Sequence, residues 1–146
     1  MMMRLHSLEI LDPTFTVCKV QSLSKVDSEA SFLFLGKTDE EISVVCPAGA
    51  VPPDVVEAEP GWKAFRVKGK LDFSLIGIIS RLTAVLARRK IGVFVISTFN
   101  TDYVLVKEKD VKAAADALAK AGFGVSGTSA ANPSAANNRP FPCNVR

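Results

Sequence analysis

Apolar residues recur at helical spacing in two stretches of the second half of the chain. In residues 72–90 they stand one, three or four positions apart, at Leu75, Ile78, Ile79, Leu82, Val85 and Leu86. This period predicts an amphipathic helix with one buried face. Residues 110–122 repeat the pattern, with Asp110 as a candidate N-cap and Gly122 at the C-terminal end, and predict a second helix.

Runs rich in β-branched and aromatic residues flank these two helices. Such runs occupy residues 61–69, 91–98, 103–107 and 123–125, and each predicts a strand. The run "IGVFVIST" (residues 91–98) is apolar on both faces, which favours a central strand. The order is therefore strand–helix–strand–strand–helix–strand, which is the ferredoxin-like arrangement.

The first half predicts a reduced version of the same order. Strand patterns occupy residues 14–20, 31–38 and 41–47, without a helical pattern between the first two, and "VPPDVVEAE" (residues 51–59) predicts a short helix that begins at proline. We therefore expect an α+β chain of two related ferredoxin-like units: a degenerate one at residues 5–60 and a complete one at 61–126. Residues 127–146, rich in Ser, Ala, Asn and Pro, predict a disordered tail.

Composition excludes several classes of protein. With 48% apolar and 23% charged residues, the chain is typical of a globular protein, and a net charge of +3 spread along the chain does not indicate nucleic-acid binding. The longest apolar-rich stretch is interrupted by Arg81 and is too short to span a bilayer. The N-terminus has no signal-peptide pattern, so we expect a cytoplasmic protein without membrane partners.

The sequence does not contain the common catalytic or metal-binding patterns. Three cysteines lie far apart and the only histidine is His6, which argues against a disulfide framework, a metal site or a histidine-based triad. The usual phosphate-binding and nucleophile motifs are also missing. We therefore expect neither a cofactor nor catalytic residues.

One polar segment does not fit an ordinary hairpin. The stretch "ISTFNTDYVLV" (residues 96–106) joins two strand patterns through hydroxyls, an amide and a carboxylate, without the glycine that tight hairpins favour. These residues, together with "EISVVC" (residues 41–46) and "DFSLIGII" (residues 72–79), resemble the CASTOR-type tandem ACT-domain family. The resemblance covers roughly residues 12–124 of this chain. The family is related to the regulatory part of aspartate kinases.

The resemblance implies binding of a free amino acid, or a close analogue, at an interface between ACT units. It places ligand contacts in three groups: the start of the first helix, the hairpin tip, and a strand that faces a neighbouring unit. The first group is Asp72, Ser74, Leu75, Ile76 and Gly77; the second is Thr98, Phe99, Asn100, Thr101 and Asp102; the third is Gly92 and Val93. Because the first half departs from a full ACT unit, we expect the site to form across a homodimer.

Each group has both a functional and a purely structural interpretation. A helix N-terminus binds a ligand carboxylate, but Asp72 also suits a simple N-cap and Gly77 simple close packing. Asp102 suits an ammonium or guanidinium, but a turn carboxylate often bonds only its own backbone. Phe99 serves equally as a ligand contact or as an apolar plug in a dimer interface.

We therefore expect a regulatory amino-acid-binding protein that acts on an enzyme or a signalling partner. Two alternatives remain open at this point. The fold could act as an enzyme on an amino-acid-derived substrate, with Asp102 and a neighbouring hydroxyl as acid and base. It could also be an assembly scaffold with a degenerate pocket.

Overall fold

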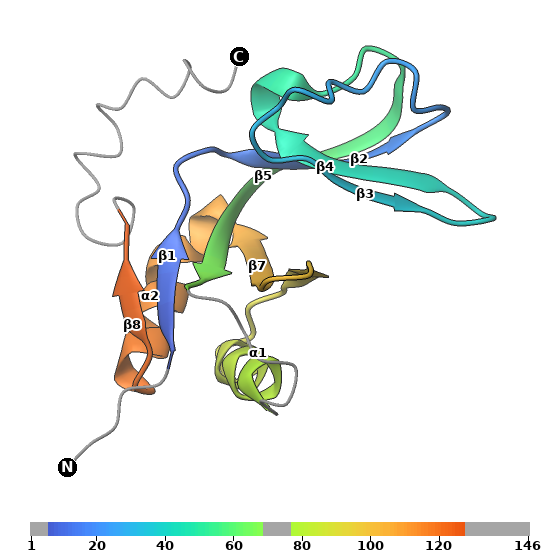
Figure 1. Cartoon of the computed structure of the whole chain (residues 1–146). Coiled ribbons are helices and arrows are strands. Elements are labelled where there is room, and N and C mark those ends of the chain that lie inside the picture. The colour runs from blue at the N-terminus through green and yellow to red at the C-terminus, as the bar shows by residue number, and fades with distance from the viewer. Residues whose placement is uncertain (1–5, 69–76, 128–146) are drawn as a thin grey trace. The chain divides into compact units, whose positions relative to one another are not determined.

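The computed structural model describes residues 6–68 and 77–127, which form two compact units. Unit 1 consists of residues 6–12, 63–68 and 77–127, and unit 2 consists of residues 13–62. The described strands and helices are β1 (Ser7–Ile10), β2 (Phe15–Val20), β3 (Phe34–Lys37), β4 (Ile42–Pro47), β5 (Val55–Val67), α1 (Ile78–Arg88), β6 (Phe94–Ser97), β7 (Asp102–Lys107), α2 (Val111–Lys120) and β8 (Gly124–Ser126), with 3₁₀ turns at Ala48–Ala50 and Glu108–Asp110. Figure 1 labels most of these elements along the chain. Within the described ranges, no helix has the length and apolar character needed to cross a membrane.

Unit 1 is a sheet with two helices on one face. The second half of β5 pairs antiparallel with β1, and β1 pairs parallel with β8; β5 also pairs with β7, and β7 forms an antiparallel hairpin with β6. The buried core lies between the sheet and both helices (Figure 1). Its fully buried members are Leu8, Phe65, Leu82, Leu86, Val104, Val106, Ala114 and Leu118. This α+β arrangement matches the ferredoxin-like order predicted for the second half.

The helices form where the apolar period predicts them, and they are shorter than the pattern. In α1 the buried positions Ile78, Leu82 and Leu86 are four residues apart, so one stripe faces the sheet. Burial of each leucine contributes about 2 kcal/mol. Asp110 is the N-cap residue of α2, as predicted, although its side chain makes no capping hydrogen bond.

Unit 2 is an antiparallel sheet in the order β3–β4–β2–β5, in which β5 contributes its first half. Residues 13–62 contain no α-helix, in agreement with the predicted loss of helices. The core of the sheet contains Cys18, Val20, Val44 and Cys46. A hydrogen bond with Cys18 is the main cause, and burial the second, of a raised pKa of the Cys46 thiol. This thiol therefore stays protonated at neutral pH, as expected for an inert core cysteine.

Three local predictions are wrong. Residues 55–59 belong to β5 and not to a helix, because Val55 and Ala58 pair with Val20 and Cys18 of β2. Strand β6 is not central, since β7 is its only partner among the described strands. Gly127, assigned to the tail, packs on the backbone of Ile10.

Strand β1 was not predicted at all. The N-terminal unit predicted at residues 5–60 includes these residues, but they pair with β5 and β8 in unit 1. The rest of the predicted tail, residues 128–146, lies outside the described residues.

Candidate functional site

The described residues include two of the three predicted contact groups and the end of the other. Gly77, the hairpin tip and the pair Gly92 and Val93 are described, whereas Asp72, Ser74, Leu75 and Ile76 lie outside the described residues. The geometry of the candidate site therefore rests on the hairpin tip, on the end of β5 and on the start of α1.

Threonine side chains close the β6–β7 hairpin in place of glycine. Ser97 pairs with Asp102 at the last rung of the ladder. The Thr98 amide and the Thr98 hydroxyl both donate to the Thr101 carbonyl oxygen, at 2.8 and 2.9 Å, and the Thr101 amide approaches the Thr98 hydroxyl at 3.4 Å. The Thr98 hydroxyl therefore donates its proton within the turn, and this hydrogen bond fixes the shape of the tip.

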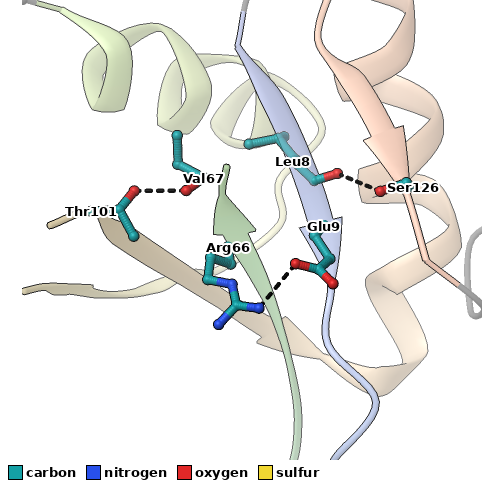
Figure 2. Close-up of polar contacts among 6 residues, drawn as sticks. All are labelled: Leu8, Glu9, Arg66, Val67, Thr101 and Ser126. Carbon is teal, nitrogen blue, oxygen red and sulfur yellow. Dashed lines mark hydrogen bonds and ion pairs between the residues drawn. The ribbon is translucent and has the colours of Figure 1, made fainter. Parts of the chain in front are cut away.

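Thr101 joins the hairpin tip to the end of β5. Its side chain is only 7% exposed, and its hydroxyl donates a 2.7 Å hydrogen bond to the Val67 carbonyl oxygen (Figure 2). Val67 is the last residue of β5, and the chain runs from there toward α1. The hairpin tip and the C-terminal end of β5 therefore lie together at one end of the unit 1 sheet.

Asp102 differs from its neighbour Thr101. Its side chain is partly buried, and its carboxylate forms no hydrogen bond or ion pair with any described residue. Strand alternation puts Asp102 on the same sheet face as Val104, which is the face that the helices cover. A carboxylate in this position can accept charge-assisted hydrogen bonds from a cation.

Phe99 and Asn100 project from the same tip into solvent. The Phe99 side chain is 73% exposed. Gly92 and Val93, which precede β6, are exposed as well. A Cβ atom added at Gly92 would meet nothing within 4 Å, so the fold of unit 1 does not itself require glycine there.

The start of α1 combines a glycine cap with a nearby guanidinium. Gly77 is the N-cap residue with φ +88°, and among the described residues no side chain caps the helix. The Nη1 atom of Arg81 lies 3.4 Å from the position that a Cβ atom of Gly77 would occupy. The first turn contains no acidic residue, so the helix dipole and the guanidinium both contribute positive potential at this end.

Sequence reasoning missed Arg81 because an arginine in a helical pattern usually indicates a solvated face. The available signal was electrostatic. A basic residue in the first turn, without acidic neighbours, opposes the dipole of its own helix. Such an arrangement favours an anion at the start of the helix.

A second polar group lies on the sheet face opposite the helices. Arg66 Nη2 and Glu9 Oε1 are 3.0 Å apart and join β5 to β1 (Figure 2). A hydrogen bond with Tyr103 of β7, together with Glu9, raises the pKa of Arg66, and the guanidinium carbon lies 6.0 Å from the Tyr103 ring centroid. Each charge is already paired, so this group links three strands and does not form an open binding site.

Comparisons with known proteins support the fold described above. A sequence model of the ACT domain matches residues 57–120. Protein Atu0741 from Agobacterium tumefaciens has a solved structure with a TM-score of 0.75 and 31% identity, over 84% of this chain and 93% of that chain. A comparison with curated proteins gave no match.

Two aspartate kinase structures share the fold at lower identity. The regulatory subunit from Thermus thermophilus, in its ligand-free form, has a TM-score of 0.57 and 8% identity over 82% of this chain and 99% of that chain. The enzyme from Clostridium acetobutylicum has a TM-score of 0.58 and 14% identity over 75% of this chain and 33% of that chain. Residues 57–120 of this chain therefore match an ACT domain, within a fold that the chain shares over most of its length with the Agobacterium protein.

Proposed function

We propose that this protein is a regulatory sensor that holds a free amino acid, or a close analogue, at an interface between ACT units. The observation that carries the proposal is the hydrogen bond from Thr101 to Val67. It holds the hairpin tip beside the end of β5. The partly buried Asp102 carboxylate, which pairs with no described residue, therefore lies at the end of the sheet from which the chain leads into α1.

The two charged groups of an α-amino acid require opposite partners. Asp102 supplies the acceptor for the ammonium group. The start of α1, with Gly77 and the Arg81 guanidinium, supplies positive potential for the carboxylate. Of the other predicted contacts, Ser74, Leu75 and Ile76 would add to the anion side, and Asp72, as a carboxylate, would add an acceptor for the ammonium group. Phe99 and Asn100 would contact the ligand side chain.

The second ACT unit of the site comes from another copy of the chain in this proposal. Strand β6 has a single described partner strand, and Val93, Val95 and Phe99 are exposed along it and at its tip. A homodimer formed through this edge would cover these apolar side chains and bring Gly92 and Val93 to the neighbouring site. Tandem ACT organisation, the CASTOR-type subfamily, the cytoplasmic location and a regulated enzyme or signalling partner belong to the same proposal.

A thermal-shift screen against the twenty standard amino acids tests the ligand assignment. We expect at least one amino acid at millimolar concentration to raise the melting temperature, since a ligand that binds only the native state stabilises it. Asp102→Asn should weaken binding of that amino acid by at least ~10-fold, because it removes the charge opposite the ammonium group.

Asp116→Asn is the matched control, because Asp116 is an exposed carboxylate on α2 that lies 3.9 Å from Lys112. Equal binding by wild type and Asp102→Asn, or no stabilisation by any amino acid, would reject the ligand assignment. Retained dimerisation without any ligand response would favour an assembly scaffold. Turnover of an amino-acid-derived substrate that is lost in Asp102→Asn would favour an enzyme.

A further inference from the structure

A groove runs along α1, apart from the residues of the hairpin tip, none of which lines it. It has a volume of about 290 Å³ and is lined by α1 and by the segment between α2 and β8. The lining residues are Ser80, Arg81, Ala84, Val85, Arg88, Ala121 and Phe123. We call this feature the α1 groove.

The α1 groove has an apolar floor between two cationic ends. Ala84, Val85 and the buried Phe123 form the floor. Arg81 and Arg88 are seven residues apart, so both lie on one side of the helix with their Cα atoms about 10 Å apart along its axis. Among the described residues, neither guanidinium forms an ion pair with a carboxylate.

We propose that the α1 groove docks an acidic amphipathic segment of a partner protein. Two carboxylates of the segment would pair with Arg81 and Arg88, and an apolar side chain between them would cover the floor. Charge complementarity carries this choice of occupant, because two guanidiniums without a carboxylate partner among the described residues flank an apolar surface. The apolar floor favours a peptide over a nucleic-acid backbone, which presents phosphates without apolar groups between them.

Arg81 also connects the groove to the proposed ligand site. Its guanidinium lies against Gly77 at the start of α1, and the same side chain lines the groove. A carboxylate bound at the helix start would compete with the docked segment for this guanidinium. This coupling rests on the proposed function. Through it, a bound amino acid lowers the affinity for the partner segment, and a docked segment lowers the affinity for the amino acid by the same factor.

Fluorescence anisotropy tests the docking step directly. The probe is a fluorescein-labelled helical peptide with two glutamates seven residues apart and leucines between them; its counterpart carries glutamines instead. We expect the glutamate peptide to bind the full chain at least ~10-fold more tightly than the glutamine peptide, with an affinity that falls as salt is added.

Arg88→Glu should weaken binding of the glutamate peptide at least ~10-fold. Arg89→Glu is the matched control: it makes the same charge change one residue further on, at an exposed position that does not line the groove. Equal losses in both variants would mean a response to net charge and would overturn the proposal. The proposal would also be overturned if single-stranded DNA displaced the labelled glutamate peptide as well as the unlabelled peptide does. It would be overturned too if the Arg88→Glu variant were a monomer while the wild type is a dimer.

An equimolar mixture of the twenty standard amino acids tests the coupling. We expect the mixture to weaken binding of the glutamate peptide at least ~3-fold in wild type but not in Arg81→Gln. If the mixture raises the melting temperature while peptide affinity stays constant, the coupling is wrong and the ligand site stands. If the mixture gives no stabilisation, the proposed function fails, whereas the docking result is judged by the Arg88→Glu comparison alone.

Discussion

Two adjacent residues of the hairpin have different physical roles. Thr101 is 7% exposed, and its hydroxyl donates a hydrogen bond to the Val67 carbonyl oxygen. Asp102 is partly buried and pairs with no described residue through its carboxylate. Thr101 therefore contributes to stability and to the position of the tip, whereas Asp102 is available for a ligand.

Thr101→Val should destabilise the protein by about 1–3 kcal/mol, because the nearly isosteric valine removes the donor and leaves the Val67 carbonyl unsatisfied in a buried site. Urea denaturation followed by circular dichroism measures this difference. Asp102→Asn should change the free energy of unfolding by less than about 0.5 kcal/mol. Similar losses in both variants would contradict the separation of roles.

Thr83→Val provides the control for loss of a hydroxyl. The Thr83 hydroxyl also donates a 2.7 Å hydrogen bond to a carbonyl, that of Ile79, within α1. A helical carbonyl already accepts a backbone hydrogen bond. We therefore expect this variant to lose less than about 0.5 kcal/mol, which would show that the Thr101 effect comes from its acceptor.

At the scale of elements, the ends of β1 and β8 depend on close approach of two backbones. Gly127 follows β8 with φ +119°, and a Cβ atom added there would lie 2.7 Å from the Ile10 carbonyl oxygen and 2.9 Å from the Ile10 amide nitrogen. Neither contact can be relieved by rotation of a side chain. Glycine is therefore required where the chain leaves β8 and passes Ile10.

Gly127→Ala should destabilise unit 1 by about 2 kcal/mol or more, because alanine is strained at positive φ and its methyl group meets backbone atoms. Chemical denaturation and hydrogen exchange of β1 and β8 amides measure the effect. Gly36→Ala is the control, since a Cβ atom at Gly36 meets nothing within 4 Å. A stability for Gly127→Ala equal to that of Gly36→Ala would show that this approach is not required.

Periodic elements could be predicted from the sequence, and elements that depend on distant partners could not. Both helices and the hairpin at Ser97–Asp102 follow from local patterns. Strand β1 has four residues, and its ion pair from Glu9 reaches Arg66, which is 57 residues away. Whether β6 is a central or an edge strand depends on tertiary pairing, because apolar β-branched residues suit both positions.

The candidate site was predictable to a similar extent. The polar residues of the hairpin tip attract attention because no glycine explains the turn. Sequence could not show that Thr98 closes that turn and that Thr101 bonds Val67, since both hydrogen bonds depend on three-dimensional proximity. The charge of Arg81 in the first turn of α1 was a signal in the sequence, but its distance to Gly77 required the structure.

At the scale of the whole molecule, unit 2 is inserted between two strands of unit 1 in the sequence. β1 precedes residues 13–62, whereas the strands that pair with it, the second half of β5 and β8, follow them. The Ser126 hydroxyl bonds the Leu8 carbonyl 118 residues away (Figure 2). Unit 1 therefore completes its sheet only after residue 126 is available, and long-range pairing of this kind slows folding.

The side of β6 that has no partner among the described strands sets the expected assembly of the whole chain. Exposed edge strands promote pairing with another chain, and here Val93 and Val95 are 36% and 38% exposed. We expect a mass of about twice 15.6 kDa at micromolar concentration. Val95→Lys should yield the monomer, because dimerisation through β6 would bury an unpaired ammonium group.

Light scattering coupled to size exclusion measures this mass. Val56→Lys is the matched control, because Val56 is a 49% exposed valine on a strand of unit 2. If the ligand site is built across the dimer, Val95→Lys should also lose the thermal shift produced by the amino acid, whereas Val56→Lys should keep it. A monomeric wild type would require the site to form within one chain, and a dimer that survives Val95→Lys would contradict assembly through β6.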